Sequence, residues 1–508
     1  MGREFIQIRE FDRLVSGSRD GIRPGCRHLD ETAFEELRDF VLRTGGQSPD
    51  SEEPVEVMRL CMEGRREAIQ ARNYVGVLTT KSGLTVEVLP KITRANEASD
   101  ELTPESPGSA PAPDEIGNSP ALSETRIFVR MLATLRGTSF KHLGRSSLFS
   151  SRRIPLYELF VAMFVDEVER LTRRGLCSGY TPRETNERFL RGRLLIAQDL
   201  RVNPIDRSRF FVRHAVYGLN RPENRLIKAA LVLLAHKSSD AENRKRIERL
   251  LCTFGGVDDT PDWRKAAALC TRDRNLDGYA QALEWSRIFL EGRSFTAFHG
   301  PTVSEALLFP MERVFEDYVP HLMRRALREK AFAGWEGLEI RTQGSMRGLF
   351  DKGGERGVGL ELRPDIVMMK RGRKTGETKP TIVLDTKWKL LDKSNPRPSR
   401  GDLYQMYAYG KRYGVRDVVL VYPLAPGLEP GWQGENMEFV CRRDGHGEGD
   451  VEDAEWNLRV RVFALDLSSA HSESTRLPGM TPSSSLFIKK GTIEDLLQDE
   501  CIRSSLAQ

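Results

Sequence analysis

Residues 359–391 read GLELRPDIVMMKRGRKTGETKPTIVLDTKWKLL. Both flanks are rich in Val, Ile and Leu, and the stretch between them carries the Gly, Lys, Arg, Thr and Pro of a turn, so the pattern predicts a β-hairpin. The apolar strands contain Asp365, Asp385 and Lys387. Because strand side chains alternate between two faces, Asp385 and Lys387 point to the same side. If the hairpin is symmetric about residue 375, Asp365 lies opposite Asp385, and the three charges share one patch.

Two carboxylates and an ammonium in one patch are groups that suit magnesium-dependent hydrolysis. Mg²⁺ prefers oxygen ligands, needs few protein carboxylates and keeps several waters. A lysine beside the ion can orient or deprotonate an attacking water while the metal stabilises charge on a phosphate, so the patch predicts phosphodiester hydrolysis. Asp-x-Lys also occurs by chance as ordinary surface charge. Its place inside IVLDTKWKLL favours an active site, because a charge in a buried strand is costly without a partner.

The overall composition is that of a soluble globular protein, with 39% hydrophobic and 30% charged residues and a net charge of +5. A length of 508 residues predicts about three domains. No apolar run approaches the roughly 20 residues of a membrane span, and the start, MGREFIQIREFD, has charges where a signal peptide has an apolar core. The seven cysteines form no C-x-x-C pair, which favours free thiols over a zinc site. We therefore expect a cytoplasmic protein without a membrane partner.

The first 92 residues predict a small β-rich domain. FIQIREF and YVGVLTTKSGLTVEVLPKI alternate as strands do, with TTKSG as a hairpin turn, and LDETAFEELRDFVLR has helical spacing. Nothing in residues 1–92 suggests chemistry, so this unit is expected to dock a partner. Residues 93–124 contain five prolines and seven acidic residues against one arginine, which predicts a flexible acidic linker or insertion.

Residues 125–300 predict a helical, arginine-rich middle domain. Apolar residues recur at three-and-four spacing in RIPLYELFVAMFVDEVERLTRRGL and NRLIKAALVLLAHKS. Residues 125–215 hold eighteen Lys or Arg and eight Asp or Glu, an excess that can neutralise DNA phosphates. Arg191 and Arg193 in FLRGRLL are therefore candidates for DNA binding. A solvated helical surface, or buried structural ion pairs, explains the same residues equally well.

Residues 301–468 predict an α/β domain around a mixed sheet. Residues 301–335, PTVSEALLFPMERVFEDYVPHLMRRALREKAFAGW, are expected to begin with a long helix that prolines kink or divide. Glu312 and Glu316 are four residues apart on one face of this helix, so a carboxylate there can approach the metal. The spacing alone favours an ordinary surface pair.

The segments after the hairpin predict a second helix and more strands. GDLYQMYAYGKRYGV predicts a helix that ends at Gly414, with Gln405 and Tyr409 on one face. RDVVLVYPL, MEFVCRR and LRVRVFALDL predict strands. Residues 469–508 are expected to be a Ser-rich tail with one short helix, TIEDLLQDE.

Taken together, these motifs resemble a known nuclease family. RPDIVM followed by IVLDTKWK resembles the PD-(D/E)xK signature, QMYAY resembles the Gln-x-x-x-Tyr helix of RecB-like nucleases, and LFPMERVFEDYV resembles the helix that precedes the core. With VEVLPKI, FLRGRL and NRLIKAAL in the same order, the chain resembles the McrC family over roughly residues 70–465. McrC is the nuclease subunit of the McrBC 5-methylcytosine-specific restriction system. The resemblance implies a restriction-endonuclease-like domain and a role in defence against foreign DNA.

The resemblance also implies roles for individual residues. It assigns the Mg²⁺ ligands to Asp365 and Asp385, the catalytic lysine to Lys387, the helix acid to Glu316, and positioning of DNA or the lysine to Gln405 and Tyr409. Glu312 is the second choice for the helix acid.

A partner is implied as well: an AAA+ GTPase of the McrB type that reads modified cytosine in DNA. In the family, the N-terminal part of the McrC subunit engages that ring and stimulates GTP hydrolysis. The present sequence contains no G-x-x-x-x-G-K-[ST] motif, so this chain is not expected to bind GTP through a P-loop.

Two other functions remain open from the sequence. One is a nuclease-like interaction protein that regulates a DNA-bound AAA+ partner without cutting. The presence of the whole set Asp, Asp-x-Lys and Gln-x-x-x-Tyr favours the enzyme. The other is a stand-alone RecB-like nuclease, which is disfavoured because the sequence has no helicase motif and no iron–sulfur cysteine cluster.

Overall fold

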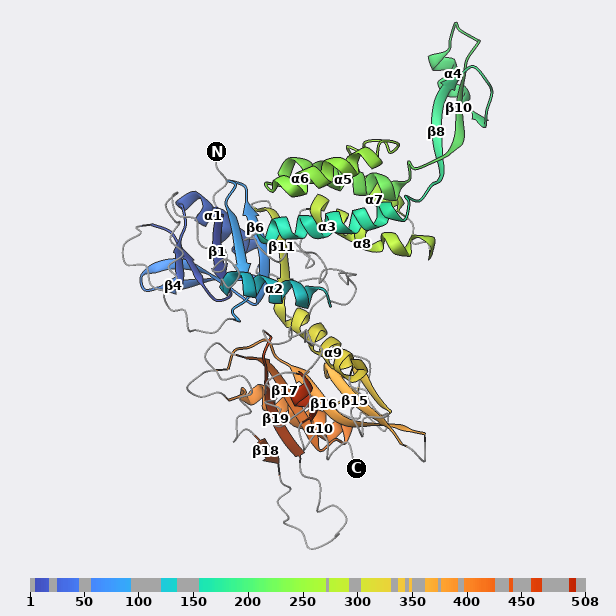
Figure 1. Cartoon of the computed structure of the whole chain (residues 1–508). Helices are drawn as coiled ribbons and strands as arrows, with labels where there is room; N and C mark the ends of the chain where they lie inside the picture. The colour runs from blue at the N-terminus through green and yellow to red at the C-terminus, as the bar shows by residue number, and fades with distance from the viewer. Residues whose placement is uncertain are drawn as a thin grey trace, which may run out of the picture.

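The computed structural model describes residues 5–17, 25–44, 56–92, 120–134, 155–270, 274–291, 303–329, 337–342, 347–349, 361–372, 376–391, 397–424, 438–441, 458–467 and 493–498. Over these residues the chain is a multidomain α/β protein with mixed sheets (Figure 1). A β-rich unit and a helical layer lie at one end, an α/β unit lies at the other, and a slender arm projects from the helical layer. None of the described helices combines the length and the apolar character that crossing a bilayer requires.

The N-terminal unit contains two four-stranded sheets, in the orders β1-β7-β6-β11 and β3-β2-β5-β4. The elements before residue 92 are β1 (Phe5–Arg9), β2 (Arg13–Val15), β3 (Cys26–His28), α1 (Glu31–Thr44), β4 (Met58–Glu63), β5 (Arg66–Ala71), β6 (Tyr74–Thr80) and β7 (Thr85–Leu89). The predicted hairpin is observed as the antiparallel pair β6–β7. The predicted helix is α1, and Asp30 begins it by accepting a hydrogen bond from the backbone N–H of Thr32.

One predicted element is wrong: the helix expected from residue 301 does not begin there. Residues Val303–Pro310 form strand β11, which pairs antiparallel with β6, and α9 (Met311–Glu329) starts directly afterwards. Leu307 and Phe309 enter one core cluster and Leu308 enters another, which is the two-residue period of a strand. A strand buried on both faces reads as a continuous apolar run, so its period is hidden in the sequence. The boundary expected at residue 301 therefore precedes a strand of the N-terminal sheet.

Gly76 of β6 is where β11 approaches most closely, and Gly76→Ala is expected to destabilise the protein by about 2 to 4 kcal/mol. A Cβ atom there would lie 1.9 Å from the backbone oxygen of Leu307, and the residue has a φ of +148°. The measurement is the thermal unfolding midpoint.

Gly83→Ala is the matched control, because Gly83 also has a positive φ (+96°) but its Cβ would meet no atom within 4 Å. Only backbone strain remains there, and it costs about 1 kcal/mol. Equal losses in the two variants would show that the close approach of β11 is unimportant.

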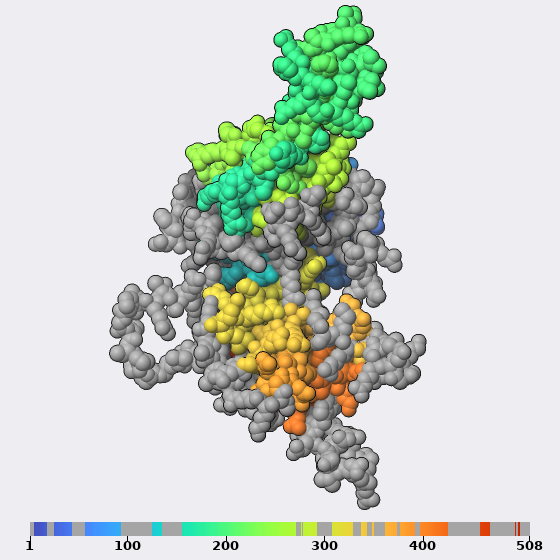
Figure 2. All heavy atoms as spheres, turned by 90° about the vertical axis from the view of Figure 1, so that its right-hand side faces the viewer, coloured from blue at the N-terminus to red at the C-terminus, as the bar shows by residue number. Residues whose placement is uncertain are grey.

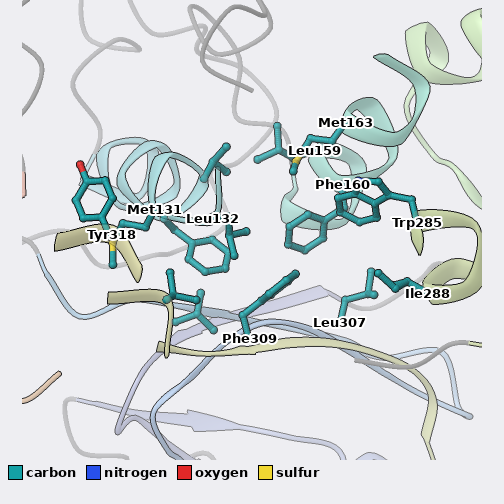
Figure 3. Packing of buried hydrophobic residues seen from close by; sticks show 14 of the residues in the cluster. Met131, Leu132, Leu159, Phe160, Met163, Trp285, Ile288, Leu307, Phe309 and Tyr318 are labelled. Carbon is teal, nitrogen blue, oxygen red and sulfur yellow. The ribbon is translucent and has the colours of Figure 1, made fainter. Parts of the chain in front are cut away.

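The helical layer covers one face of the first sheet. Its helices are α2 (Pro120–Leu132), α3 (Leu156–Arg173), α5 (Pro222–Lys237), α6 (Ala241–Thr253), α7 (Trp263–Leu269), the 3₁₀ turn η4 (Arg274–Tyr279) and α8 (Ala280–Glu291). Figure 3 shows Leu307 and Phe309 of β11 facing Phe160 of α3 and Leu132 of α2. The ring centroids of Phe309 and Phe160 lie 5.4 Å apart. Helix α2 begins at Pro120, so the last residues of the predicted 93–124 linker are helical; the rest of the linker lies outside the described residues.

The middle region is not helical throughout, because residues 179–218 form the projecting arm (Figures 1 and 2). The arm consists of β8 (Gly179–Glu187), β9 (Arg193–Leu194), α4 (Ile196–Val202) and β10 (Phe210–Gly218), in the sheet order β8-β10-β9. Of its apolar side chains only Val212 is fully buried. Strand periodicity in this polar segment is weak, which is why the helical spacing of the flanks dominated the prediction.

The C-terminal unit contains a six-stranded mixed sheet in the order β12-β15-β16-β17-β19-β18. Its strands are β12 (Leu338–Thr342), β15 (Ile366–Arg371), β16 (Thr378–Thr386), β17 (Asp417–Pro423), β18 (Glu438–Cys441) and β19 (Leu458–Leu465), with a separate short pair β13 (Arg347–Gly348) and β14 (Glu361–Leu362). Strands β16, β17 and β19 are parallel, whereas β12, β15 and β18 join antiparallel.

Helices α9 and α10 of this unit lie on opposite faces of the sheet. Ile382 and Leu384 of β16 pack in the cluster that contains α9, whereas Val383 packs with Met406 of α10 (Arg400–Tyr413). The short helix predicted in the tail is α11 (Ile493–Gln498), and it packs against α9. Because β16 is sandwiched between the helices, the charged residues at its end are held by both layers.

Candidate active site

The hairpin β15–β16 carries the aspartates at its open end. At this end the strands pair in the register predicted from the symmetry of the hairpin. Ile366 pairs with Leu384 and Val367 with Val383, and a bulge shifts the register only nearer the turn, between Met368 and Met369. Asp365, immediately before β15, therefore lies beside the end of β16.

Asp365 is fixed there by the residue after Asp385. The backbone N–H and the hydroxyl of Thr386 both donate to Asp365 Oδ2, at 2.7 and 2.6 Å. The structure thus brings the two aspartates together at the carboxyl end of β16. Thr386 was not identified from the sequence, although its position between Asp385 and Lys387 marks it as a neighbour of both.

Three carboxyl groups meet at this point, and their pKa values respond to burial and crowding. Burial raises the pKa of Asp385 to about 7, and the negative charge of Asp365 adds to the effect. Burial also raises the pKa of Asp365, against the hydrogen bonds from Thr386. Asp365 shares a further hydrogen bond with Glu316 of α9, which requires a proton on one of the two carboxyl groups.

The structure separates the two candidate acids on α9. Glu316 joins the aspartates, whereas Glu312 accepts a hydrogen bond from Asn73 Nδ2 at 3.0 Å, in the N-terminal unit. Glu312 is thus part of the contact between the two units. The preference for Glu316 that came from the family resemblance agrees with this placement.

Lys387 supplies the positive charge of the cluster. Its Nζ lies 2.6 Å from Asp385 Oδ2, so the two residues share a face as their spacing predicts. Burial alone would lower the pKa of Lys387, but the carboxylate of Asp385 and the more distant Asp365 outweigh it, and the pKa is raised. Lys387 is therefore an ammonium at neutral pH, suited to orienting water and stabilising negative charge rather than to removing a proton.

A chain of hydrogen bonds connects Lys387 to helix α10. Lys387 Nζ donates to Gln405 Oε1 at 2.9 Å, and Gln405 Nε2 donates to the hydroxyl of Tyr409 at 2.8 Å. Tyr409 donates to the backbone oxygen of Arg363, two residues before Asp365, at 3.1 Å. This hydrogen-bond network begins at Lys387, at the end of β16, and ends at Arg363, just before β15. It therefore fixes the lysine relative to the aspartates.

Helix α10 is capped at both ends. Ser399 is the N-cap residue, and it forms a reciprocal capping box with Asp402. Gly414 ends the helix in the left-handed conformation, with a φ of 66°. The positions of Gln405 and Tyr409 therefore follow from local sequence signals.

The cluster has the donor set expected for a magnesium ion. Asp365, Asp385 and Glu316 lie together, and one ammonium, that of Lys387, contacts Asp385; a divalent cation would balance the remaining negative charge. Within the described part of the chain, no three His, Cys, Asp or Glu side chains are arranged as a ready-made metal cage. Two aspartate ligands with water completing the shell would satisfy Mg²⁺, which seldom uses an all-protein cage.

Arg191 and Arg193 lie elsewhere. Both are exposed on the arm, and Figure 1 shows the arm at the far end of the molecule from β15 and β16. The alternative that they form buried ion pairs is therefore wrong, and the structure does not bring them to the aspartates.

A link to the N-terminal unit was not visible in the sequence. The indole N–H of Trp388, next to Lys387, donates to the buried carboxyl of Glu10 at 2.9 Å. The ring of Trp388 lies 5.3 Å from that of Phe315, the neighbour of Glu316. Since 378 residues separate Glu10 from Trp388, no sequence pattern predicts this contact.

The link makes stability depend on pH. Burial raises the pKa of Glu10 to about 8, despite hydrogen bonds from Trp388 and the backbone of Lys91 that favour the carboxylate. The folded chain binds this proton more tightly than the unfolded chain, so the contribution of Glu10 to the free energy of unfolding falls between about pH 5 and about pH 8. Glu10→Gln should flatten this part of the pH profile of the unfolding midpoint. Glu35→Gln, at an exposed position on α1, should leave the profile unchanged; an unchanged profile in Glu10→Gln would refute the assignment.

Comparison with known proteins gave a family match and related folds. Residues 69–423, more than half of the chain, match the family model described as McrBC 5-methylcytosine restriction system component. The fold is similar to a chain in the refined half-complex from the tetradecameric assembly of Thermococcus gammatolerans McrB AAA+ hexamers with bound McrC, with a TM-score of 0.58, 17% identity, and coverage of 97% of this chain and 99% of that chain. A chain of the cryo-EM structure of the Thermococcus gammatolerans McrBC complex matches with a TM-score of 0.41, 18% identity, and coverage of 64% and 88%. No curated protein sequence matched significantly.

Proposed function

The chain belongs to the family of McrBC 5-methylcytosine restriction system components, and from this premise we propose that it is the nuclease subunit of such a system. It would be a cytoplasmic, magnesium-dependent DNA endonuclease of the PD-(D/E)xK type that cuts cytosine-modified DNA. The observation that carries the proposal is the cluster of Asp365, Asp385 and Glu316, with the ammonium of Lys387 against Asp385. A regulatory protein without activity needs no such concentration of buried charge, which is costly to maintain.

Each residue of the cluster has a role in the proposed reaction. Asp365 and Asp385 would hold Mg²⁺, and the ion would stabilise negative charge on the scissile phosphate. Thr386 keeps Asp365 oriented through two hydrogen bonds. Lys387 stays protonated and places positive charge beside the attacking water, while Gln405 and Tyr409 keep the lysine in position.

The partner in this proposal is an AAA+ GTPase of the McrB type. The similar chain named above comes from an assembly of McrB AAA+ hexamers with bound McrC. The present sequence has no P-loop, so GTP hydrolysis would belong to the partner, and this chain would stimulate it.

The arm is the surface best suited to dock that partner. Its exposed large hydrophobic side chains are Tyr180, Phe189, Leu190, Ile196, Leu200, Val202, Ile205 and Tyr217. Residues 5–92, where the sequence placed docking, expose only Phe5, Leu42 and Met62 among the described positions. Exposed apolar clusters on a slender projection mark a binding surface, because water contact with them is unfavourable until a partner covers them.

The test of the function is cleavage of cytosine-methylated DNA by the chain with its GTPase partner, GTP and Mg²⁺. Chelation of the metal should stop cleavage. Lys387→Ala should slow it by about 100-fold or more, and added Mg²⁺ should not restore it, because the lysine is not a ligand. Lys389→Ala is the matched control: Lys389 is two residues away and half exposed, and pairs with Asp402. Equal cleavage by Lys387→Ala, Lys389→Ala and the wild type would exclude this cluster as the active site of the nuclease.

A further inference from the structure

The outward face of α10 has a surface composition unlike the rest of its domain. Its exposed side chains are Arg400, Tyr404, Tyr407 and Lys411. Their spacing of four, three and four residues places them in one stripe along the helix. Tyr404 is 74% exposed and Tyr407 is 45% exposed, and from residue 303 onward they are the only exposed large hydrophobic side chains among those described.

The stripe is positively charged. The only acidic residue of α10, Asp402, is buried, where it bonds Ser399 and the hydroxyl of Tyr422. The outward face therefore carries Arg400 and Lys411 with no carboxylate of the same helix between them. Cations that alternate with exposed aromatic rings suit a nucleic-acid strand, in which phosphates alternate with bases.

The stripe lies on the same helix as Gln405, on the face turned away from the sheet, and this helix packs closely on the sheet. Tyr404 is next to Gln405, whose Oε1 accepts the hydrogen bond from Lys387. The inner side of α10 packs so closely on β19 that a Cβ on Gly410 would lie 2.3 Å from Leu458 Cδ1. A strand bound along the stripe would therefore be held at a constant position relative to the aspartates.

We propose that Arg400, Tyr404, Tyr407 and Lys411 form a DNA-contacting face on the helix that also carries Gln405 and Tyr409. The two cations bind phosphates of a DNA strand that extends from the active site, and the two tyrosine rings stack on bases of this strand where it is locally unpaired. This inference rests on the proposed nuclease function, since it identifies the substrate surface of the same site.

Binding is tested with the full chain in EDTA, so that no cleavage occurs, by fluorescence anisotropy of labelled single-stranded and duplex 24-mers. Tyr404→Ala/Tyr407→Ala should weaken single-strand binding by about tenfold or more, whereas the corresponding double Phe variant should stay close to wild type. Arg400→Ala/Lys411→Ala should reduce the slope of log affinity against log salt by about one to two. The matched control is Val232→Ala/Leu269→Ala, which removes two exposed apolar side chains of α5 and α7 that belong to neither proposed surface. This variant should bind DNA as the wild type does.

Cleavage in the complex separates this inference from the proposed function. The double Ala variant at positions 404 and 407 should raise KM for DNA and leave kcat within about threefold, because the tyrosines position DNA and do not take part in the chemistry. If the wild-type chain cuts DNA and the double Ala variant has unchanged DNA binding and KM, the proposed DNA-contacting face would be refuted, while the nuclease function would stand. If the double Ala variant loses DNA binding but even the wild-type chain never cuts DNA, the result would support the proposed DNA-contacting face and count against the nuclease function. A changed oligomeric state or partner GTPase rate, with DNA binding unaltered, would make the face a protein interface and also overturn the inference.

Discussion

Asp385→Asn is expected to slow cleavage of cytosine-methylated DNA by about 10³-fold or more, a loss of about 4 kcal/mol of transition-state stabilisation. Asp385 is 1% exposed, and its carboxylate lies between Asp365 and Lys387. Asparagine has nearly the same shape but no charge, so the variant should fold and yet hold Mg²⁺ poorly. Assembly with the GTPase partner and GTP hydrolysis should persist, since the proposed docking surface is the distant arm.

Metal binding gives a second readout that does not depend on activity. A ligand that binds only the folded state raises the unfolding midpoint, so Mg²⁺ should raise it in the wild type and not in Asp385→Asn. Glu377→Gln is the control, because Glu377 is an exposed carboxylate at the turn end of the same hairpin. Near-normal cutting by Asp385→Asn would favour the regulatory function. Loss of partner GTPase stimulation together with cutting would indicate that the strand end has a structural role instead.

Phe189→Ser/Ile205→Ser is expected to weaken association with the GTPase partner by about 100-fold or more and to leave the fold intact. These two side chains are 79% and 92% exposed, so they contribute little to the packing of the arm. A contact that buries them would lose apolar area on both, and central apolar anchors dominate the free energy of association. Co-purification and stimulated GTP hydrolysis are the measurements.

The control for this variant also tests the alternative docking surface. Leu42→Ser/Met62→Ser changes two side chains of the N-terminal unit that are 60% and 62% exposed. Loss of the complex in this control, with the arm variant unaffected, would return the docking surface to residues 1–92, where the sequence placed it. Loss in the arm variant alone would assign it to residues 179–218.

The catalytic strands could be predicted because their signals are local. The turn composition of residues 370–380 and the alternation on both sides predicted the hairpin, and the two-residue period placed Asp385 and Lys387 on one face. Even the pairing of Ile366 with Leu384 followed from the symmetry of the hairpin, although the bulge nearer the turn did not. Likewise, helix α10 ends where its glycine predicts, and Gln405 and Tyr409 share a face because they are four residues apart.

The sequence by itself thus determined the elements of the candidate site, while the tertiary structure decided how distant segments join them. Only the fold shows that β11 completes the N-terminal sheet, that Glu316 rather than Glu312 reaches Asp365, and that residues 179–218 leave the helical layer as an arm. Only the fold, too, places Glu10 against Trp388. The physical reason is the range of the interactions. Periodicity, turns and caps depend on residues within one or two turns of chain, whereas these contacts depend on how whole layers pack, which no local pattern encodes.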